Sequence, residues 1–296
     1  KSMPIRSHRY QLLVSLLTVA LIPICVLIGY QSWLLQAEIR KAEEHQSVST
    51  QQIADQIESF VEMHRRGIEA AAFQITQSGE RSKEKLDAIL VALYRQFPGF
   101  INMYFADRRA TTLAFHPEFN ARGESMVGAD FSFREHFKNL LKEPRTYISP
   151  VLKGIGGTEK LLCTIVAPYF DKSGNFDGFV LGALDLEKIG TIIERAGLDK
   201  NIYAVVTDDR GHAIYAPGWS ALSHPEVLDI KAVSQANLVP GQIRLIRHDS
   251  SLTKQPVVTT AAVLASPSWY VWLSIPQAEE NAIFHQWLAS SAALGF

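Results

Sequence analysis

Cysteine is nearly absent from this sequence. The two cysteines among its 296 residues, Cys25 and Cys163, are too few for a disulfide framework. Cys25 lies in the most apolar run of the chain, where lipid is expected, whereas Cys163 lies in the apolar segment 161–166, which is typical of a buried strand. No bridge is expected between two such environments. We therefore interpret both as small buried hydrophobic residues.

An excess of charge of one sign is also lacking. Lys and Arg together number 29 and Asp and Glu number 30, so the formal net charge is −1. Proteins that bind DNA or RNA carry a basic patch or stripe, often in a strongly basic domain. The composition therefore argues against a nucleic-acid partner.

Motifs for catalysis and metal binding are missing as well. The nine histidines never fall in the H-x-H or H-E-x-x-H spacing of metal sites. Residues 154–158, with the sequence GIGGT, lack the Gly-Lys-Ser/Thr ending of a phosphate-binding loop, and Ser149 and Ser220 have no nucleophile elbow around them. We expect no enzymatic activity, no metal and no cofactor in this chain.

One long apolar run stands near the start of the sequence. No charged side chain occurs from 10 to 37, and residues 10–30 have about the length that crosses a hydrocarbon core of ~30 Å. Three basic residues precede it, Lys1, Arg6 and Arg9, whereas acidic and basic residues are mixed after it. By the positive-inside rule, residues 1–9 are cytoplasmic, 10–30 form a transmembrane helix and the bulk lies outside the inner (plasma) membrane.

A cleaved signal peptide is the alternative to this anchor. Its apolar part would be shorter and would end in an Ala-x-Ala site, but the run continues through 30–35 without one, which favours an uncleaved anchor. The sequence turns apolar again at 282–296. We expect 278–296 to be the start of a second, truncated transmembrane helix, with a short amphipathic helix on the domain as the alternative.

A long helix is predicted after the anchor. Residues 31–76 contain no proline and one glycine, Gly67, and their apolar residues recur every three or four positions, as at Ile53, Ile57 and Val61. Such a helix reaches roughly 65–70 Å. It has more apolar surface than one small lobe can cover, so we predict that it supports the domain and pairs in a parallel homodimer. A second helix is predicted to follow at 82–96, within a stalk of residues 31–96.

Strands and turns dominate from position 100 onward. A hairpin is predicted around the turn at 106–109, then a short helix at 131–141 and strands at 145–149, 161–169 and 178–186. Two strands, a helix and three antiparallel strands are the layout of a PAS-like sensor module. The second half repeats it weakly, with a hairpin at 202–215 and strands at 243–247, 257–264 and 269–275. The predicted fold class is therefore α+β, with two lobes.

Four segments carry a resemblance to a known family: 127–137 (VGADFSFREHF), 147–151 (YISPV), 167–174 (APYFDKSG) and 182–186 (GALDL). In order and spacing they resemble the double Cache (dCache) family, the extracytoplasmic sensors of bacterial transmembrane receptors. The resemblance runs from about 31 to 277. It implies a ligand in the membrane-distal lobe, about 97–190, a membrane-proximal lobe at 191–277 that usually has none, and a signalling domain outside this chain. That output domain would be a histidine kinase, or alternatively a diguanylate cyclase or the signalling coil of a chemotaxis receptor.

The resemblance also implies where the ligand binds. Arg134, at the start of a short helix, corresponds to the residue that holds the ligand carboxylate, and a guanidinium is a fixed and always charged fork for that purpose. In amino-acid-binding relatives, Trp and Tyr follow this Arg at the second and third positions. Here those positions hold His136 and Phe137.

Two further positions decide the expected ligand. Relatives that bind amino acids place a Tyr on the next strand and an Asp two residues on, which correspond to Tyr147 and Ser149 here, and a last Asp corresponds to Asp185. One of two acidic partners for an ammonium group is thus missing. We expect a small organic acid, with an amino acid or amine, or a ligand-free tethered structural domain, as the alternatives. Without the resemblance, Arg134 would be taken for a surface residue and Asp185 for a partner of Lys188.

Overall fold

The structure is a computed structural model that describes residues 5–155, 160–217 and 227–278. The chain divides into two compact units, of which the larger comprises residues 47–276 and is called the sensor unit below. The sensor unit combines helices with two antiparallel sheets, so the predicted α+β class is confirmed. Apart from Ala278, the predicted second membrane segment lies outside the described residues.

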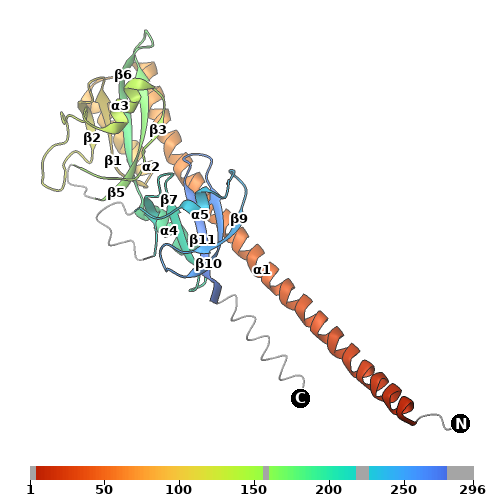
Figure 1. The fold of residues 1–296 in the computed structure, drawn as a ribbon. Helices are drawn as coiled ribbons and strands as arrows, with labels where there is room; N and C mark the ends of the chain where they lie inside the picture. The colour runs from red at the N-terminus through yellow and green to blue at the C-terminus, as the bar shows by residue number, and fades with distance from the viewer. Residues whose placement is uncertain (1–4, 156–159, 218–226, 279–296) are drawn as a thin grey trace. The chain divides into compact units, whose positions relative to one another are not determined.

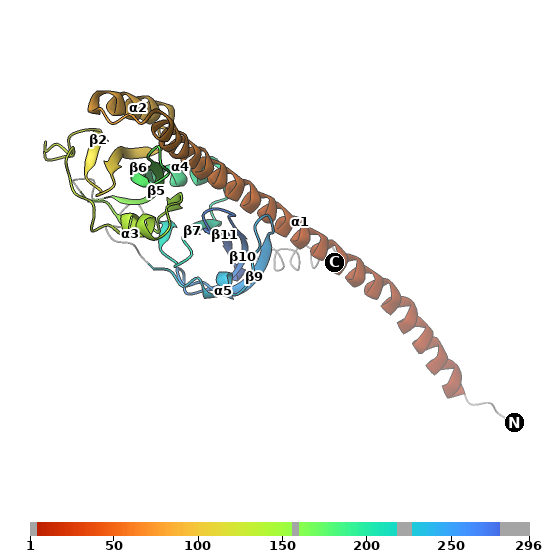
Figure 2. The same ribbon diagram turned by 90° about the horizontal axis from the view of Figure 1, so that it is seen from above.

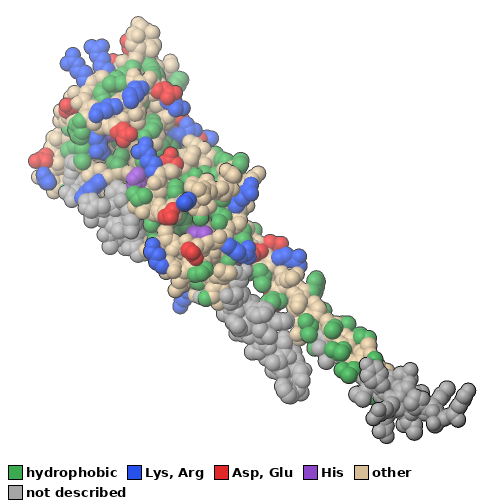
Figure 3. All heavy atoms as spheres, in the orientation of Figure 1, with side chains coloured by type: hydrophobic (Ala, Val, Ile, Leu, Met, Phe, Trp, Pro, Cys, Tyr) green, Lys and Arg blue, Asp and Glu red, His purple; other side chains and the backbone are tan. Residues whose placement is uncertain are grey.

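One continuous helix, α1, runs from Ile5 to Ser78, so the predicted membrane span and the predicted long helix are not separated by a break. Its N-terminal part is long and apolar enough to cross a membrane, and none of the residues whose burial is described in that apolar window is buried. Leu16 and Val19, for example, are each 71% exposed, and hydrophobic side chains follow this part of the helix in Figure 3. Pro23 lies inside the helix without ending it.

The first lobe contains the helix α2 (Lys83–Gln96) and a six-stranded antiparallel sheet with the strand order β2-β1-β6-β5-β3, in which β4 also pairs with β5 (Figure 1). Its remaining elements are β1 (Phe100–Asp107), β2 (Thr112–His116), α3 (Glu135–Lys142), β3 (Tyr147–Ile148), β4 (Leu152–Lys153), β5 (Leu161–Phe170) and β6 (Phe176–Asp185). The hairpin, the helix at 82–96 and three of the strands stand where the sequence predicts them. The short helix predicted at 131–141 begins only at Glu135, because Phe131 and Arg134 form a turn before it, and the two-residue β4 was not predicted.

The second lobe repeats this arrangement in a five-stranded sheet with the order β8-β7-β11-β10-β9. Its elements are α4 (Glu187–Arg195), β7 (Tyr203–Thr207), β8 (Ala213–Tyr215), α5 (Lys231–Ser234), β9 (Arg244–Asp249), β10 (Pro256–Val263) and β11 (Tyr270–Pro276). In both sheets the first strand (β1 or β7) lies between its hairpin partner (β2 or β8) and the last strand of the lobe (β6 or β11). The next-to-last strand (β5 or β10) pairs with the other edge of that last strand. This shared order is the structural form of the predicted duplication. The short helices α4 and α5 were not predicted.

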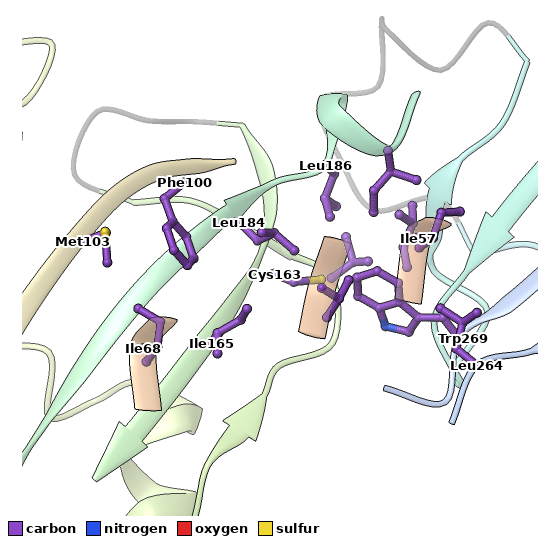
Figure 4. Packing of buried hydrophobic residues seen from close by; sticks show 14 of the residues in the cluster. Ile57, Ile68, Phe100, Met103, Cys163, Ile165, Leu184, Leu186, Leu264 and Trp269 are labelled. Atoms are coloured by element: carbon purple, nitrogen blue, oxygen red, sulfur yellow. The ribbon is translucent and has the colours of Figure 1, made fainter. Parts of the chain in front are cut away.

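The sensor-unit part of α1 packs along both lobes with its apolar stripe inward. Ile57 and Ile68 are fully buried, in one core that includes Trp269 of the second lobe and Met103 and Leu184 of the first (Figure 4). The apolar surplus that predicted a homodimer is therefore covered by the chain's own two lobes. The stripe therefore needs no second chain to cover it, because both lobes pack on the helix, and the homodimer stays a prediction.

The two faces of the first sheet have different partners. Side chains alternate between faces along a strand, so Met103 and Phe105 of β1 face the α1 and α2 side, whereas Tyr104 belongs to the cluster around α3 (Figure 2). The helix α1 packs closely on β6 at Gly182, where an added Cβ atom would lie 2.9 Å from the Cδ1 atom of Ile68. The α3 face carries the candidate site.

Candidate ligand-binding site

A small cavity lies on the α3 face of the first sheet, with a volume of about 40 Å³. Alternate residues of three strands line it: Asn102 and Tyr104 of β1, Leu162 and Thr164 of β5, and Leu181 and Ala183 of β6. Phe115, Phe131, Arg134, His136, Gly154 and Ile155 complete the lining. A volume of this size holds on the order of three water molecules. The cavity therefore suits a very small ligand.

Arg134 is placed at the cavity by a tight turn at the start of α3. Phe131 is buried and its N–H donates to the carbonyl of Ala110 at 3.0 Å, while the N–H of Arg134 donates back to the carbonyl of Phe131 at 3.0 Å. The Arg134 side chain is half-buried, and burial lowers the pKa of its guanidinium, which nevertheless stays charged. Among the residues that the structure describes, no carboxylate forms an ion pair with it.

His136 contributes a neutral hydrogen-bonding group. It is 4% exposed, and its Nε2 lies 3.3 Å from the hydroxyl of Tyr104, whose ring stacks on Phe115 and Phe131. Burial, assisted by the charge of Arg134, lowers the pKa of His136 to about 3. Burial also raises the pKa of the Tyr104 phenol, so neither ring carries charge near neutral pH. Arg134 is thus the cationic group of the cavity.

Thr164 presents a buried hydroxyl to the same cavity. The residue is 3% exposed, and its Oγ1 has no hydrogen-bond partner within the described part of the chain. An unsatisfied buried hydroxyl costs about 1–3 kcal/mol. A ligand oxygen beside Arg134 that hydrogen-bonds to this hydroxyl would remove that cost.

The other predicted site residues lie around the cavity rather than in its lining. Phe137 is 6% exposed and packs on Phe179, with 5.9 Å between ring centroids. Tyr147 and Ser149 line a neighbouring cleft together with Arg134 and His136. The Ser149 hydroxyl donates to the carbonyl of Pro150 and accepts the N–H of Thr164, both at 2.8 Å, so it supports the strand behind the cavity.

Asp185 lies at the end of β6, two residues beyond Ala183 and thus on the same face of the sheet. Its Oδ1 accepts the N–H of Glu187 at 3.1 Å, at the start of α4. It does not belong to the cavity lining, and no described carboxylate does. The structure therefore brings Arg134 and His136 together and keeps Asp185 outside.

Comparison with known proteins decides the family. A profile described as "Cache domain", of the double Cache type, matches residues 31–283. This chain belongs to the double Cache family. That membership makes it an extracytoplasmic ligand-binding sensor domain of the kind found in receptors. No curated protein matches the sequence.

Solved structures share the double Cache fold at low sequence identity. An extracellular ligand-binding receptor from Desulfohalobium retbaense has a TM-score of 0.63 at 20% identity, over 78% of this chain and 40% of that one. The ligand-binding domain of the Pseudomonas aeruginosa amino-acid chemoreceptor PctC, in complex with GABA, has a TM-score of 0.60 at 22% identity, over 79% and 100%. The extracellular domain of rpHK1S-Z16, assigned as a histidine kinase, has a TM-score of 0.67 at 12% identity, over 80% of this chain and 95% of that one.

Sequence reasoning missed three polar residues of the cavity in this double Cache domain, Asn102, Tyr104 and Thr164. Each stands in a segment that was predicted as a strand, and each alternates with residues on the opposite face. The available signal was Thr164 itself, a hydroxyl within the otherwise apolar run from Leu161 to Val166. A partner strand can satisfy such a hydroxyl, so the sequence does not distinguish a core threonine from a ligand-binding one.

Proposed function

We propose that this chain is the sensing region of a transmembrane receptor and that it binds a small carboxylate in the first-lobe cavity. The observation that carries the proposal is a cavity lined by two groups, the Arg134 side chain without a described ion pair and the Thr164 hydroxyl without a described hydrogen-bond partner, while its described lining holds no carboxylate. Arg134 supplies parallel N–H donors to the carboxylate, and Thr164 supplies one more hydrogen bond. Neutral His136 and Tyr104 are available to a hydroxyl or keto oxygen on the ligand.

The other predicted residues act from outside the cavity in this proposal. Phe137 holds α3 on the sheet, Ser149 positions the backbone of Thr164, and Tyr147 stands at the neighbouring cleft. A short carboxylate of two to four carbons suits the volume better than a larger acid. Its binding would act as a signal only in so far as it favours one of two states of the receptor.

An amino acid or amine is the second candidate ligand. Two observations favour it: Asp185 continues the cavity face of β6, and the similar chemoreceptor PctC was solved with GABA. Against it, Asp185 already receives the backbone N–H of Glu187, and an ammonium group in the cavity would lack a charged partner. Losing such a partner weakens binding by about 1.5–3 kcal/mol.

The placement of the receptor in its membrane follows from α1. In this proposal its apolar part crosses the inner membrane, the second lobe is membrane-proximal, and the first lobe, which contacts the end of α1 near Thr76, is membrane-distal. The output domain would be a histidine kinase, with a diguanylate cyclase as the alternative. A parallel homodimer would use the exposed side of α1, where Met63, Ala70 and Phe73 recur at helical spacing opposite the buried stripe.

Thermal stability of the purified chain with acetate, propionate or pyruvate, compared with glycine and alanine, tests the ligand. At 100 times its Kd a ligand adds about 2.7 kcal/mol, or roughly 5–10 °C for a protein of this size. We expect Arg134→Ala to abolish the shift and Arg109→Ala, an exposed arginine on the β1–β2 turn, to keep it. Equal shifts in both variants would refute the assignment of Arg134. No shift with any compound would favour a ligand-free domain.

A further inference from the structure

A second cavity, larger than the first, lies between the two lobes of the sensor unit. Its volume is about 260 Å³, against about 40 Å³ for the first-lobe cavity. The first lobe contributes Arg134 and Tyr147, and the second lobe contributes Arg210 and His212 from the β7–β8 turn. We call this cavity the inter-lobe cleft.

The cleft has an excess of positive charge. Within the described ranges, neither Arg134 nor Arg210 forms an ion pair with a carboxylate, and the two residues line one cavity from opposite lobes. Glu135 is the carboxylate of the lining, and it is exposed to solvent, where its charge is screened. Burial and then the charge of Glu135 raise the pKa of the Tyr147 phenol, and the charge of Arg210 opposes that rise, so Glu135 and Arg210 both act on this space.

A buried carboxylate holds the second-lobe side of the cleft in place. Asp208 is 1% exposed, and its Oδ1 accepts the N–H groups of Arg210 and His212 at 2.9 and 2.8 Å. Its Oδ2 accepts the N–H of Val151 in the first lobe at 3.2 Å and lies 2.9 Å from Nδ1 of His212. Since a carboxylate only accepts hydrogen bonds, Nδ1 is the donor and the Nε2 atom remains for the cleft. The β7–β8 turn is thus anchored to the first lobe through Asp208.

We propose that the inter-lobe cleft binds a small, doubly charged oxyanion, held between Arg134 of the first lobe and Arg210 of the second. Two planar forks with no carboxylate of their own match the oxygens of a phosphate or of a short dicarboxylate. Such an anion would add a charged link between the lobes beside the Asp208 to Val151 hydrogen bond. Because Arg134 also lines the first-lobe cavity, the two sites are coupled through one side chain. This site goes beyond the proposed function, with which it shares Arg134.

Isothermal titration of the full chain in detergent with inorganic phosphate and with succinate, at constant ionic strength, tests the proposal. We expect saturable binding of at least one anion. The anion that binds more tightly shows whether the cleft prefers a phosphate or a dicarboxylate. Arg210→Gln should weaken it by on the order of tenfold to a hundredfold. Arg195→Gln, which removes the same charge from an exposed position at the end of α4, should leave the affinity unchanged.

Two further results separate this site from the first-lobe cavity and from a loss of folding. Thr164→Val should weaken the binding of a small monocarboxylate but not of the dianion, because Thr164 does not line the cleft. Without added anion, the Arg210→Gln variant should have the same melting temperature as the unsubstituted protein, because the exposed Arg210 side chain makes no described ion pair. The proposal is overturned if neither anion binds saturably, or if Arg210→Gln and Arg195→Gln bind the dianion equally well.

Discussion

Acid should destabilise the sensor unit well before its carboxylates are protonated, because it buries neutral histidines. Burial lowers the pKa of His136 from 6.5 to about 3, and burial also lowers the pKa of His64, whose Nε2 has no described partner. A histidine with a lowered pKa binds fewer protons in the folded state than in the unfolded state. Stability is therefore complete above the unfolded pKa of 6.5 and is lost as the pH falls from there toward 3.

The magnitude follows from the same values. Each pH unit below 6.5 costs about 1.4 kcal/mol for His136 alone, so at pH 5 the loss is about 2 kcal/mol and near pH 3 it approaches 5 kcal/mol. His64 adds to this loss in the same direction. Carboxylates with lowered pKa values, such as Glu62 at about 2, lose their contribution only below the unfolded value of 4.5. The interval from pH 7 to pH 5 therefore isolates the histidines.

Urea unfolding at pH 7 and pH 5, followed by the fluorescence of buried Trp269 and Trp272, measures this loss. The unchanged protein should lose about 2 kcal/mol or more between the two pH values. His136→Gln, which keeps a polar group near the Tyr104 hydroxyl but does not titrate, should lose about 2 kcal/mol less over the same interval. His248→Gln, at a partly exposed position on β9, is the control. If His136→Gln and the unchanged protein lose the same amount, His136 is not buried as a neutral group.

Two other predictions concern α1. Ile57→Ala should lower the free energy of unfolding by about 2–5 kcal/mol, because Ile57 is fully buried within one chain, whereas Met63→Asp on the exposed side should change it by about 0.5 kcal/mol or less and should dissociate the proposed homodimer. A dimer that survives Met63→Asp but not a substitution in the buried stripe would contradict this assignment of the interface. A reporter fused after Gln36 should be active only on the outer side of the membrane, because Lys1, Arg6 and Arg9 precede the apolar run. Activity in the cytoplasm would exclude the receptor topology.

Much of the fold is encoded locally and was accessible to sequence reasoning. The α1 pattern requires only that apolar residues recur at helical spacing, and both hairpins require only alternating strands around turns such as 106–109 and 208–211. The apolar run at 10–30 depends on composition alone. Arg134 was predicted through the resemblance of residues 127–137 to the double Cache family, and the turn that precedes its helix is itself a local structure.

The character of the site depends on tertiary contacts between segments far apart in the sequence. Thr164 differs from an ordinary core threonine because no group in the described part of the chain hydrogen-bonds to its hydroxyl. The Ser149 hydroxyl is already hydrogen-bonded because β3 lies against β5. The apolar stripe of α1 is buried within one chain because a second lobe is present to cover it. The inter-lobe cleft exists because the β7–β8 turn docks on Val151 through Asp208, which brings Arg210 opposite Arg134. A sequence pattern gives the spacing of apolar residues within one segment and so predicts its helix or strand. Burial, hydrogen-bond partners and charge pairing depend on which distant segments come into contact in the folded chain.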